Sequence, residues 1–307
     1  MIAVLCGGVG GSRFLRSLTA VVAPDRITAI VNTGDDDWFH GLYVSPDPDI
    51  ITYTLAGEVD EERGWGLRGD TFRWLDALRR FGHETWFQIG DRDLATHIHR
   101  TRLMREGRTL SECIEDVRHA FGVTMRLLPM SDDPVRTIVE TDAGAFSFQR
   151  YLVQRRAADP ITDVRYEGAR TAAPAPGVLD ALRDAEAIFI ASSNPIGSIR
   201  PILAVPGIED ALRTASVPRV AVSPIIAGRS LQPPAAEMMA GLGFEVSPAG
   251  VATVYDGLID ALVVDTADAD AALPPAVRRI VAPAVMHDDA SRRALAEAAL
   301  QAAGLSV

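Results

Sequence analysis

Carboxylate side chains concentrate in one short stretch near the N-terminus, and their spacing points to metal chemistry. Asp35, Asp36 and Asp37 are consecutive, and Asp47 and Asp49 follow shortly after them. Neighbouring carboxylates repel one another unless a cation or solvent relieves the repulsion. Hard divalent cations such as Mg²⁺ bind carboxylate oxygens and bridge them to phosphate. The stretch therefore predicts Mg²⁺ ligation by Asp35, Asp36 and Asp47; the alternatives are a solvated loop and, for Asp49, a helix cap.

A glycine-rich turn, Gly7-Gly8-Val9-Gly10-Gly11-Ser12-Arg13, precedes these acids. Glycines let a backbone approach a ligand closely, and the start of a following helix supplies N–H donors and a positive dipole. The turn therefore predicts a phosphate-binding site, with a plain tight turn as the alternative. The residues that we expect to bind a nucleotide phosphate here are Gly8, Gly10, Gly11, Ser12 and Arg13.

Two common nucleotide-binding motifs do not fit this turn. A dinucleotide fingerprint needs a small residue where Arg13 stands and an acid where Asn32 stands, so an NAD-dependent dehydrogenase is disfavoured. All 30 basic residues are arginine, which excludes both a P-loop lysine and a Schiff-base lysine. Arginine and backbone N–H groups are left to hold a small anion.

Further polar residues come directly after short apolar runs. Asn32 follows Ile27–Val31, and Ser192, Ser193 and Asn194 follow Ala187–Ala191. The carboxyl ends of parallel strands meet at one edge of a sheet, where ligands bind. We therefore expect these four polar residues to contact the nucleotide, although turns favour the same residue types.

Three other side chains are candidates for substrate contact. The guanidinium group of Arg92 suits an anion or a polyol. His97 lies in the same motif, Gly90–His97, and the ring of Trp38 suits stacking on a flat heterocycle. The alternatives are surface charge, a structural histidine and ordinary packing.

The elements that must position these residues form a repeating pattern. Ile2–Cys6 and Ile27–Val31 are typical of buried parallel strands, and a helix capped by Ser12 is expected between them, ending near Val22. Ala187–Ala191, Arg219–Val222 and Ala261–Val264 repeat the strand pattern. The sequence therefore predicts an α/β fold, a doubly wound Rossmann-like parallel sheet.

The middle of the chain has a different pattern. Thr71–Phe81 and Leu94–Phe121 have helical spacing, with a break at Gly107, and Thr137–Glu140 with Ala145–Phe148 predicts a β-hairpin. We therefore expect a nucleotide-binding core of residues 1–60 and 178–307. Residues 61–177 are expected to form an inserted helical and β-hairpin region that encloses the substrate. A closing helix is expected from Asp288.

Composition limits the classes of partner. The chain has 307 residues and a net charge of −11, which argues against nucleic acid and against anionic membranes. Its two cysteines cannot form a disulfide framework. We see neither a signal-peptide pattern nor a long apolar run, so a cytoplasmic location is expected.

Seven segments, taken in order, resemble the 2-phospho-L-lactate transferase family (CofD, called FbiA in actinobacteria) of coenzyme F-420 biosynthesis. The resemblance implies that the terminal ribitol hydroxyl of the deazaflavin FO attacks a guanosine diphosphate conjugate. The phosphate that carries the acid moves to FO, GMP leaves and magnesium assists; the acid is lactate in archaea and enolpyruvate in actinobacteria. The resemblance also implies a homodimer. The segments are Leu5–Leu15, Asn32–Gly57, Arg63–Phe72, Gly90–His97, Leu128–Val135, Ser192–Ile196 and Gly250–Asp260.

The resemblance also implies roles for individual residues. Asp49 and Arg92 match positions associated with FO contact, and we expect Asp49 to bind FO and to act as a base. Trp38 and His97 are further expected FO contacts, and Asp36 is expected to act in catalysis as well as in metal binding. Magnesium held by carboxylates would neutralise charge on the departing GMP.

Two positions depart from the family pattern. Arg200 stands where the family has glycine, and Pro233 replaces the glycine of a Gly-Pro-Ala segment. Proline has no N–H group, so recognition of the base is expected to differ if that N–H normally contacts the nucleotide. The main alternative function is a non-catalytic regulator that shares the glycine turn and binds a nucleotide sugar. The motifs Arg63–Phe72 and Gly90–His97 favour the transferase.

Overall fold

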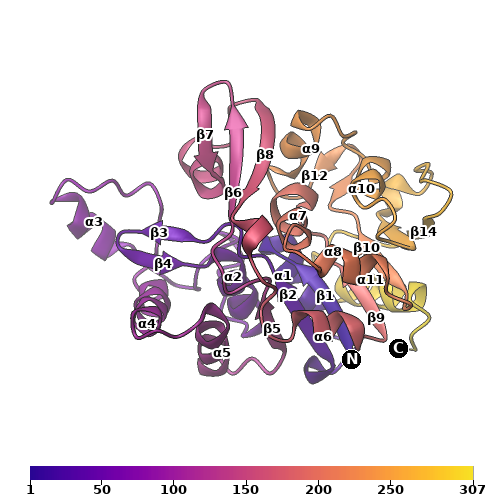
Figure 1. Cartoon of the computed structure of the whole chain (residues 1–307), viewed down its shortest axis with the longest axis horizontal. Helices are drawn as coiled ribbons and strands as arrows, with labels where there is room; N and C mark the ends of the chain where they lie inside the picture. The colour runs from indigo at the N-terminus through magenta and orange to yellow at the C-terminus, as the bar shows by residue number, and fades with distance from the viewer. Residues whose placement is uncertain (307) are drawn as a thin grey trace.

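A seven-stranded parallel sheet forms the centre of the computed structural model, which describes residues 1–306 (Figure 1). The strand order is β14-β13-β10-β9-β1-β2-β5. This confirms the expected doubly wound α/β fold. The strands are β1 (Ile2–Cys6), β2 (Ile27–Val31), β5 (Arg126–Pro129), β9 (Ala187–Ile190), β10 (Arg219–Val222), β13 (Ala261–Val264) and β14 (Arg278–Val281).

The winding of the chain creates a switch point between β1 and β9. From β1 the chain adds β2 and then β5 on one side, and it then crosses back to add β9, β10, β13 and β14 on the other. In such sheets ligands bind beyond the carboxyl ends of the strands at the point where the order reverses. The turns after β1 and β9 are therefore the first place to look for a site.

Helices cover both faces of the sheet, which explains why its strands read as continuous apolar runs. Along β1, Ile2, Val4 and Cys6 face one hydrophobic cluster, while Ala3 and Leu5 face the other. The first face is covered by α1 (Gly8–Leu18), α2 (Pro46–Leu55), α5 (Leu110–Ala120) and α11 (Asp289–Ala302). The second is covered by α6 (Val178–Arg183), α7 (Arg200–Leu203), α8 (Ile208–Arg213), α9 (Ala235–Gly241) and α10 (Pro248–Val254).

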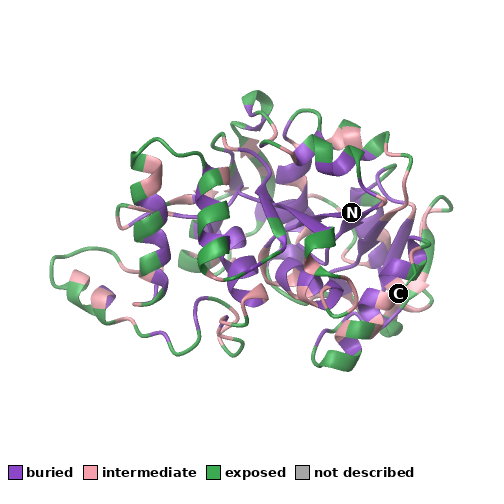
Figure 2. Cartoon of the chain, turned by 90° about the horizontal axis from the view of Figure 1, so that it is seen from below, coloured by how far each residue is buried: buried purple, intermediate pink, exposed green. Residues whose placement is uncertain are grey.

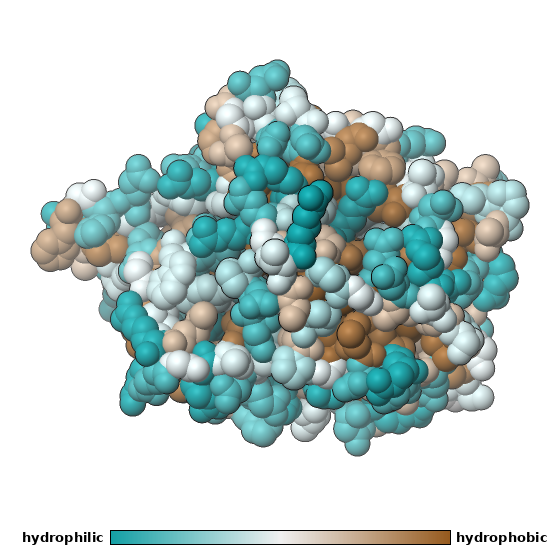
Figure 3. All heavy atoms as spheres, viewed as in Figure 1, coloured by the Kyte–Doolittle hydropathy of each residue, from teal (hydrophilic) through white to brown (hydrophobic). Residues whose placement is uncertain are grey.

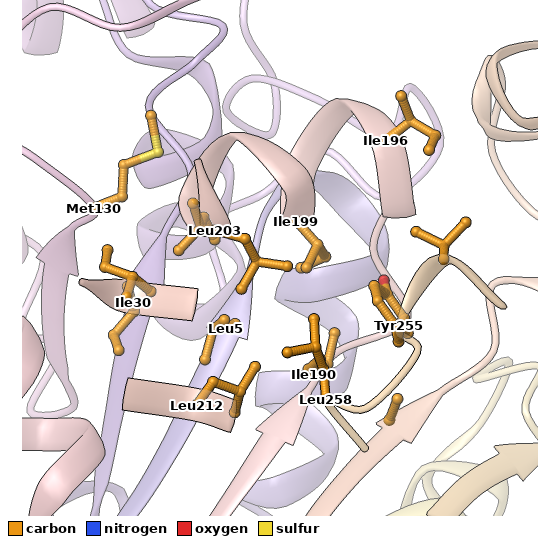
Figure 4. Packing of buried hydrophobic residues seen from close by; sticks show 14 of the residues in the cluster. Leu5, Ile30, Met130, Ile190, Ile196, Ile199, Leu203, Leu212, Tyr255 and Leu258 are labelled. Carbon is orange, nitrogen blue, oxygen red and sulfur yellow. The ribbon is translucent and has the colours of Figure 1, made fainter. Parts of the chain in front are cut away.

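The figures show this layering directly. Buried residues run through the central sheet, whereas the outer sides of the helices are exposed (Figure 2). Leu5, Ile30 and Ile190 lie beneath Ile199 and Leu203 in the second cluster (Figure 4). On the outer surface, hydrophobic residues appear between hydrophilic ones (Figure 3). No helix within residues 1–306 is long and apolar enough to span a membrane.

The first helix begins five residues earlier than the sequence predicted. α1 starts at Gly8, with Gly7 as its extended N-cap, and it ends at Leu18. The prediction that Ser12 caps the helix is wrong, because its Oγ lies within the helix and donates to the carbonyl of Val9 at 2.9 Å. The glycines of the turn therefore form the first turn of the helix.

The inserted region is divided by a strand of the central sheet. Between β2 and β5 the chain forms β3 (Asp37–Phe39), β4 (Leu42–Val44), α2, α3 (Arg73–Arg79), α4 (Asp93–Arg105) and α5. Between β5 and β9 it forms an antiparallel sheet, ordered β7-β6-β8, from β6 (Arg136–Thr141), β7 (Gly144–Ser147) and β8 (Ile161–Glu167). This sheet stands above the core in Figure 1. The expected hairpin is confirmed, but the range 61–177 must be corrected, because β5 belongs to the core.

A short hairpin follows β10 and completes the list of elements. Its strands are β11 (Ile225–Ile226) and β12 (Arg229–Ser230). The closing helix expected from Asp288 is α11, whose N-cap is Asp288. The side chain of Asp288 accepts a hydrogen bond from the backbone N–H of Ser291 at 2.7 Å, which fixes the start of the helix.

Candidate active site

A cavity of about 890 Å³ opens at the carboxyl edge of the sheet, at the point between β1 and β9 where the strand order reverses. It is formed by the turns after β1 and β9, by the start of α2, by loops from both excursions and by the segment before α11. Eleven of the residues that the sequence assigned to the site line it: Gly8, Gly10, Ser12, Arg13, Asp35, Asp47, Asp49, His97, Ser192, Ser193 and Asn194. Gly11, Asn32, Asp36, Trp38 and Arg92 do not line it.

The turn after β1 packs tightly against the turn after β9. A Cβ atom at Gly10 would overlap the carbonyl oxygen of Ser192, and one at Gly11 would lie 2.8 Å from the Oγ of Ser193. Ser193 also joins the two turns, since its Oγ accepts from the N–H of Gly7 at 3.0 Å and donates to its carbonyl at 2.7 Å. Gly10 and Gly11 thus permit close packing between these two turns.

Asn194 has a structural role beside its place in the cavity. Its Oδ1 accepts hydrogen bonds from the backbone N–H groups of Ile196 and Gly197, both at 3.0 Å. It thereby caps the π-helical turn Pro195–Ile199, which leads into α7. The hydrogen-bond donors that remain available to a ligand at the carboxyl edge of the sheet are therefore mainly backbone N–H groups and the side chain of Arg13.

Asp35 and Asp47 are two buried carboxylates that both line the cavity. Asn32 orients one of them, because its Nδ2 donates to the Oδ2 of Asp47 at 2.9 Å. The backbone N–H of Gly8 also donates to Asp47, which therefore lies at the N-terminus of α1. Asn32 thus positions a carboxylate without lining the cavity itself.

Burial and mutual repulsion disfavour the charged forms of these acids. Burial raises the pKa of Asp47 to about 6, against the opposing hydrogen bonds from Asn32 and Gly8. Burial also raises the pKa of Asp35, and the neighbouring carboxylates Asp47 and Asp36 raise it further. A bound cation would relieve both effects.

Asp36 points away from the cavity. Its Oδ2 accepts hydrogen bonds from the Oγ of Ser45 at 2.7 Å and from the hydroxyl of Tyr43 at 3.2 Å. Burial raises the pKa of Asp36, while the Ser45 hydrogen bond and the charge of Arg100 oppose that rise. These contacts tie the acidic loop to the segment before α2.

The donors available to a metal are few but suitable for magnesium. The Oδ1 atoms of Asp35 and Asp36 are buried and have no hydrogen-bond partner within residues 1–306. Among residues 1–306 there is no group of three or more His, Cys, Asp or Glu side chains that could hold a metal by itself. Mg²⁺ commonly binds through one or two carboxylates together with substrate phosphates. Asp35 and Asp47 fit that arrangement, and Asp36 does not face it.

Helix α4 buries a polar face beside the cavity. Its buried side chains are Asp93, Thr96, His97, Arg100 and Thr101. Arg100 is 1% exposed and forms a two-pronged ion pair with Asp49, in which Nη1 donates to Oδ2 at 3.0 Å and Nη2 donates to Oδ1. Such a pair fixes the carboxylate in one orientation.

His97 lies between two carboxylates. Its Nε2 is 3.3 Å from Asp93 Oδ1, and its Nδ1 is 3.7 Å from Asp49 Oδ2. The hydroxyl of Tyr53 donates to the same Asp93 oxygen at 2.6 Å. Burial opposes ionisation of Asp93, but His97 and these hydrogen bonds bring its pKa below the ordinary value. Asp49 and His97 are thus held rigidly at the cavity wall.

Two expected substrate contacts lie elsewhere. Arg92 donates through Nη1 to the carbonyl of Arg68 at 2.6 Å and through Nη2 to Glu58 at 3.1 Å. Trp38 is 45% exposed and makes an edge contact with the ring of Tyr43. Neither side chain lines the cavity in this structure, and their expected contact with the substrate stays a prediction.

Other lining residues were not identified from the sequence as site residues. Large apolar side chains that are exposed at the cavity wall are Trp65, Val153, Leu231 and Val285. The remaining wall includes Trp86, Phe87 and Phe148, and the cations Arg16, Arg63 and Arg292. Apart from Arg16, which lies on α1, these residues are far from the glycine turn in sequence, so only folding brings them to it. An apolar wall of this kind suits a flat heterocycle.

The two positions that depart from the family pattern differ in location. Pro233 lines the cavity together with Gln232, Pro234 and Ala235. Arg200 does not line it; its guanidinium lies 5.3 Å from the ring centroid of Phe244. Only Pro233 is therefore placed to change direct contact with a ligand.

The chain matches one family model and is similar to curated proteins of that family. A family model described as 2-phospho-L-lactate transferase CofD matches residues 2–303. The chain is 45% identical over 276 residues to the phosphoenolpyruvate transferase of Streptomyces coelicolor, covering 88% of this chain and 86% of that protein. It is 40% identical over 265 residues to the 2-phospho-L-lactate transferase of Methanococcoides burtonii, covering 86% of each.

A solved structure supports the fold. A crystal structure of a UPF0052 family member from Bacillus halodurans matches with a TM-score of 0.55 at 19% identity. The match covers 86% of this chain and 79% of that one. At this level of identity the likeness concerns the fold alone.

Proposed function

The chain belongs to the 2-phospho-L-lactate transferase CofD family, and we propose from this premise that it transfers a phosphorylated acid to the terminal ribitol hydroxyl of FO. The donor in this proposal is a guanosine diphosphate conjugate of enolpyruvate or lactate, and GMP is released. The observation that best supports it is the cavity at the switch point, where a glycine turn meets the carboxylates of Asp35 and Asp47. Its volume, about 890 Å³, is large enough for ligands of this size.

The reaction exchanges one P–O bond for another. The ribitol oxygen forms a bond to the phosphorus that carries the acid, and the bond from that phosphorus to the phosphate of GMP breaks. GMP leaves with the electron pair, and the ribitol hydroxyl loses its proton. Because transfer of this kind needs little covalent help, positioning and charge stabilisation supply most of the catalysis.

The nucleotide end of the donor belongs at the glycine turn in this proposal. Backbone N–H groups at the start of α1, with Arg13 beside them, suit the diphosphate. The turn after β9 forms the opposite wall through Ser192 and Asn194. The segment at Pro233 is then available to contact the nucleoside.

We propose that Asp35 and Asp47 hold Mg²⁺ together with the donor phosphates. Both line the cavity, and an Oδ1 atom of Asp35 is buried without a partner. When bound, Mg²⁺ would neutralise negative charge that develops on the leaving phosphate. Asp36 would support this site by holding the loop through Ser45 and Tyr43.

Asp49 is proposed to bind the ribitol hydroxyl. Its two contacts with Arg100 hold the carboxylate in one orientation. It retains lone pairs that can accept a hydrogen bond from the hydroxyl and orient the oxygen for attack. We therefore propose an orienting role for Asp49, and its expected role as a base stays a prediction.

The direct test mixes the protein with FO, Mg²⁺ and each donor in turn and measures GMP and the phosphodiester product. We expect at least one donor to give both products in equal amounts. Omitting FO should stop GMP release, because hydrolysis is not the proposed reaction. Absence of product with both donors would contradict the proposed function, and binding of a nucleotide sugar without turnover would favour the regulator.

Magnesium binding should depend on pH through Asp47. The folded protein raises the pKa of this acid to about 6, so protons compete with the metal below that value. Mg²⁺ with GDP should therefore raise the thermal unfolding midpoint at about pH 7.5 and have little effect at about pH 5. GDP without metal is the control. An equal magnesium effect at both pH values would remove Asp47 from the metal site.

A further inference from the structure

The loop from residue 58 to residue 68 forms a closed hairpin-like turn at the cavity. Val59 and Leu67 are buried and pair as an isolated antiparallel bridge. Backbone hydrogen bonds join Asp60 N to Gly66 O at 3.0 Å and Arg68 N to Glu58 O at 2.8 Å. The residues at its tip that line the cavity include Arg63, Gly64, Trp65 and Gly66. The loop therefore holds its tip in a defined position at the wall.

Arg63 is fixed on several sides within this loop. Its Nη2 donates to Asp60 Oδ2 at 2.8 Å, and its backbone N–H donates to Asp60 Oδ1 at 3.0 Å. Its guanidinium carbon lies 5.0 Å from the ring centroid of Trp65 and 4.9 Å from that of Phe72. Contacts of both kinds restrict a guanidinium group to one plane and reduce the entropy lost on binding.

One nitrogen of this fixed group is unused. The Nη1 of Arg63 is buried and has no hydrogen-bond partner among the described residues. It lies 3.9 Å from the place where a Cβ atom of Gly66 would stand. A buried N–H group without a partner costs free energy, and an anionic oxygen that entered from the cavity would recover that cost.

The other arginine side chains near the cavity pair with a carboxylate or lie in the glycine turn. Arg16 donates to Glu61 at 2.6 Å. Arg292 donates to Asp289 at 2.8 Å; its Nε is also buried without a partner among the described residues, but no aromatic ring of those residues lies against its guanidinium group as it does for Arg63. Arg100 is buried against Asp49, and Arg13 belongs to the glycine turn. Asp60 also pairs with Arg63, but that contact leaves Nη1 unbound.

The proposed donors carry a second anionic group besides the diphosphate. Both enolpyruvate and lactate bear a carboxylate next to the carbon that holds the phosphate oxygen. We propose that Arg63 binds this carboxylate through Nη1 and so selects donors that carry an acid. This inference rests on the proposed function, because it assigns a residue to the group being transferred.

The test compares two donors that differ only in the carboxylate. One is the guanosine diphosphate conjugate of lactate, and the other is its isopropyl counterpart, in which methyl replaces the carboxylate. Initial rates with FO and Mg²⁺ give kcat/KM for each donor. In the wild type the carboxylate should raise kcat/KM roughly 100-fold, as expected for a hydrogen bond between charged groups.

Arg63→Gln should remove that preference and leave the isopropyl donor nearly unaffected. Arg63→Lys keeps a cation without the planar fork and should restore part of the preference. Arg68→Gln is the matched control, since Arg68 lies in the same loop, does not line the cavity, and donates to the carbonyl of Gly57. It should keep the wild-type preference.

The outcomes separate this inference from the function on which it rests. Equal losses with both donors in Arg63→Gln and Arg63→Lys would overturn the carboxylate role and leave transferase activity in place. Equal use of both donors by the wild type would also overturn it. Wild-type protein that releases no GMP from either conjugate, and none from the enolpyruvyl donor, would overturn the proposed function itself.

Discussion

Asp47→Asn is expected to stabilise the protein without ligands and to reduce transfer roughly 10³-fold, since metal charge stabilisation contributes several kcal/mol. The carboxylate lies in the wall of the cavity and is 5% exposed. Asparagine keeps an oxygen that can accept from the Nδ2 of Asn32, so the local geometry should persist. It supplies no negative charge for Mg²⁺, and activity should fall for that reason.

The stability gain follows from the sign of the pKa shift. Folding raises the pKa of Asp47 from 3.8 to about 6, mainly because the carboxylate is buried. The folded state therefore binds more protons than the unfolded state between these values, and its stability falls as pH rises through them. Above about pH 6 the cost is complete, on the order of 3 kcal/mol at 1.36 kcal/mol per pKa unit. The neutral side chain of asparagine avoids this cost of burying a charged carboxylate.

Urea unfolding without metal at about pH 7.5, combined with the transfer assay, checks both effects. Asp142→Asn is the control, because Asp142 is exposed at the tip of the β6–β7 hairpin. It should change neither quantity. A variant at Asp47 that transfers at the wild-type rate would refute the assignment, and one that unfolds more easily would refute the charge argument.

Arg100→Met should destabilise the protein by about 3–5 kcal/mol, the usual cost of removing one partner from a buried ion pair. Methionine fills similar space but leaves the carboxylate of Asp49 buried without a counter-charge. His97, whose Nδ1 lies 3.4 Å from Arg100 Nη1, would lose a neighbour as well. The wall of the cavity should therefore loosen, and transfer should fall with it.

A double-mutant cycle tests whether this cost belongs to the pair. The double variant Asp49→Asn with Arg100→Met removes both charges and should be more stable than Arg100→Met alone. Arg102→Met is the control, since Arg102 lies on the same helix but is 74% exposed in its side chain. Tryptophan fluorescence in urea reports each free energy of unfolding. If Arg100→Met had the free energy of unfolding of the wild type, the ion pair between Arg100 and Asp49 would not stabilise the fold.

The core strands could be predicted because burial on both faces leaves an unbroken apolar run. β1, β2, β9, β10 and β13 all have this pattern. β5 and β14 are the two edges of the sheet and carry Arg126, Arg278 and Arg279, so their runs are short and mixed. Pro129 ends β5, as proline is tolerated at an edge. Edge strands depend on a partner that the local sequence does not reveal.

The residues of the candidate site differ in the same way: some could be predicted from the local sequence, and others depend on distant partners. Residues next to strand ends, such as Asp35 and Ser192, could be placed because topology brings those ends together. Arg100 could not, because its partner Asp49 lies 51 positions away on another helix. The helical spacing of Asp93, His97 and Arg100 was the available clue: it indicates a buried polar face on α4. Trp38 and Arg92 do not line the cavity, because proximity in sequence does not fix the direction of a side chain.

An isotope label can follow the oxygen of the acceptor through the proposed transfer. FO labelled with ¹⁸O at its terminal ribitol hydroxyl is mixed with the protein, Mg²⁺ and a guanosine diphosphate donor, and both products are analysed by mass spectrometry. We expect one ¹⁸O atom in the phosphodiester product and none in GMP, because the ribitol oxygen attacks the phosphorus that carries the acid. An ester between FO and GMP, loss of the label to water, or release of GMP with unmodified labelled FO would contradict the proposed transfer.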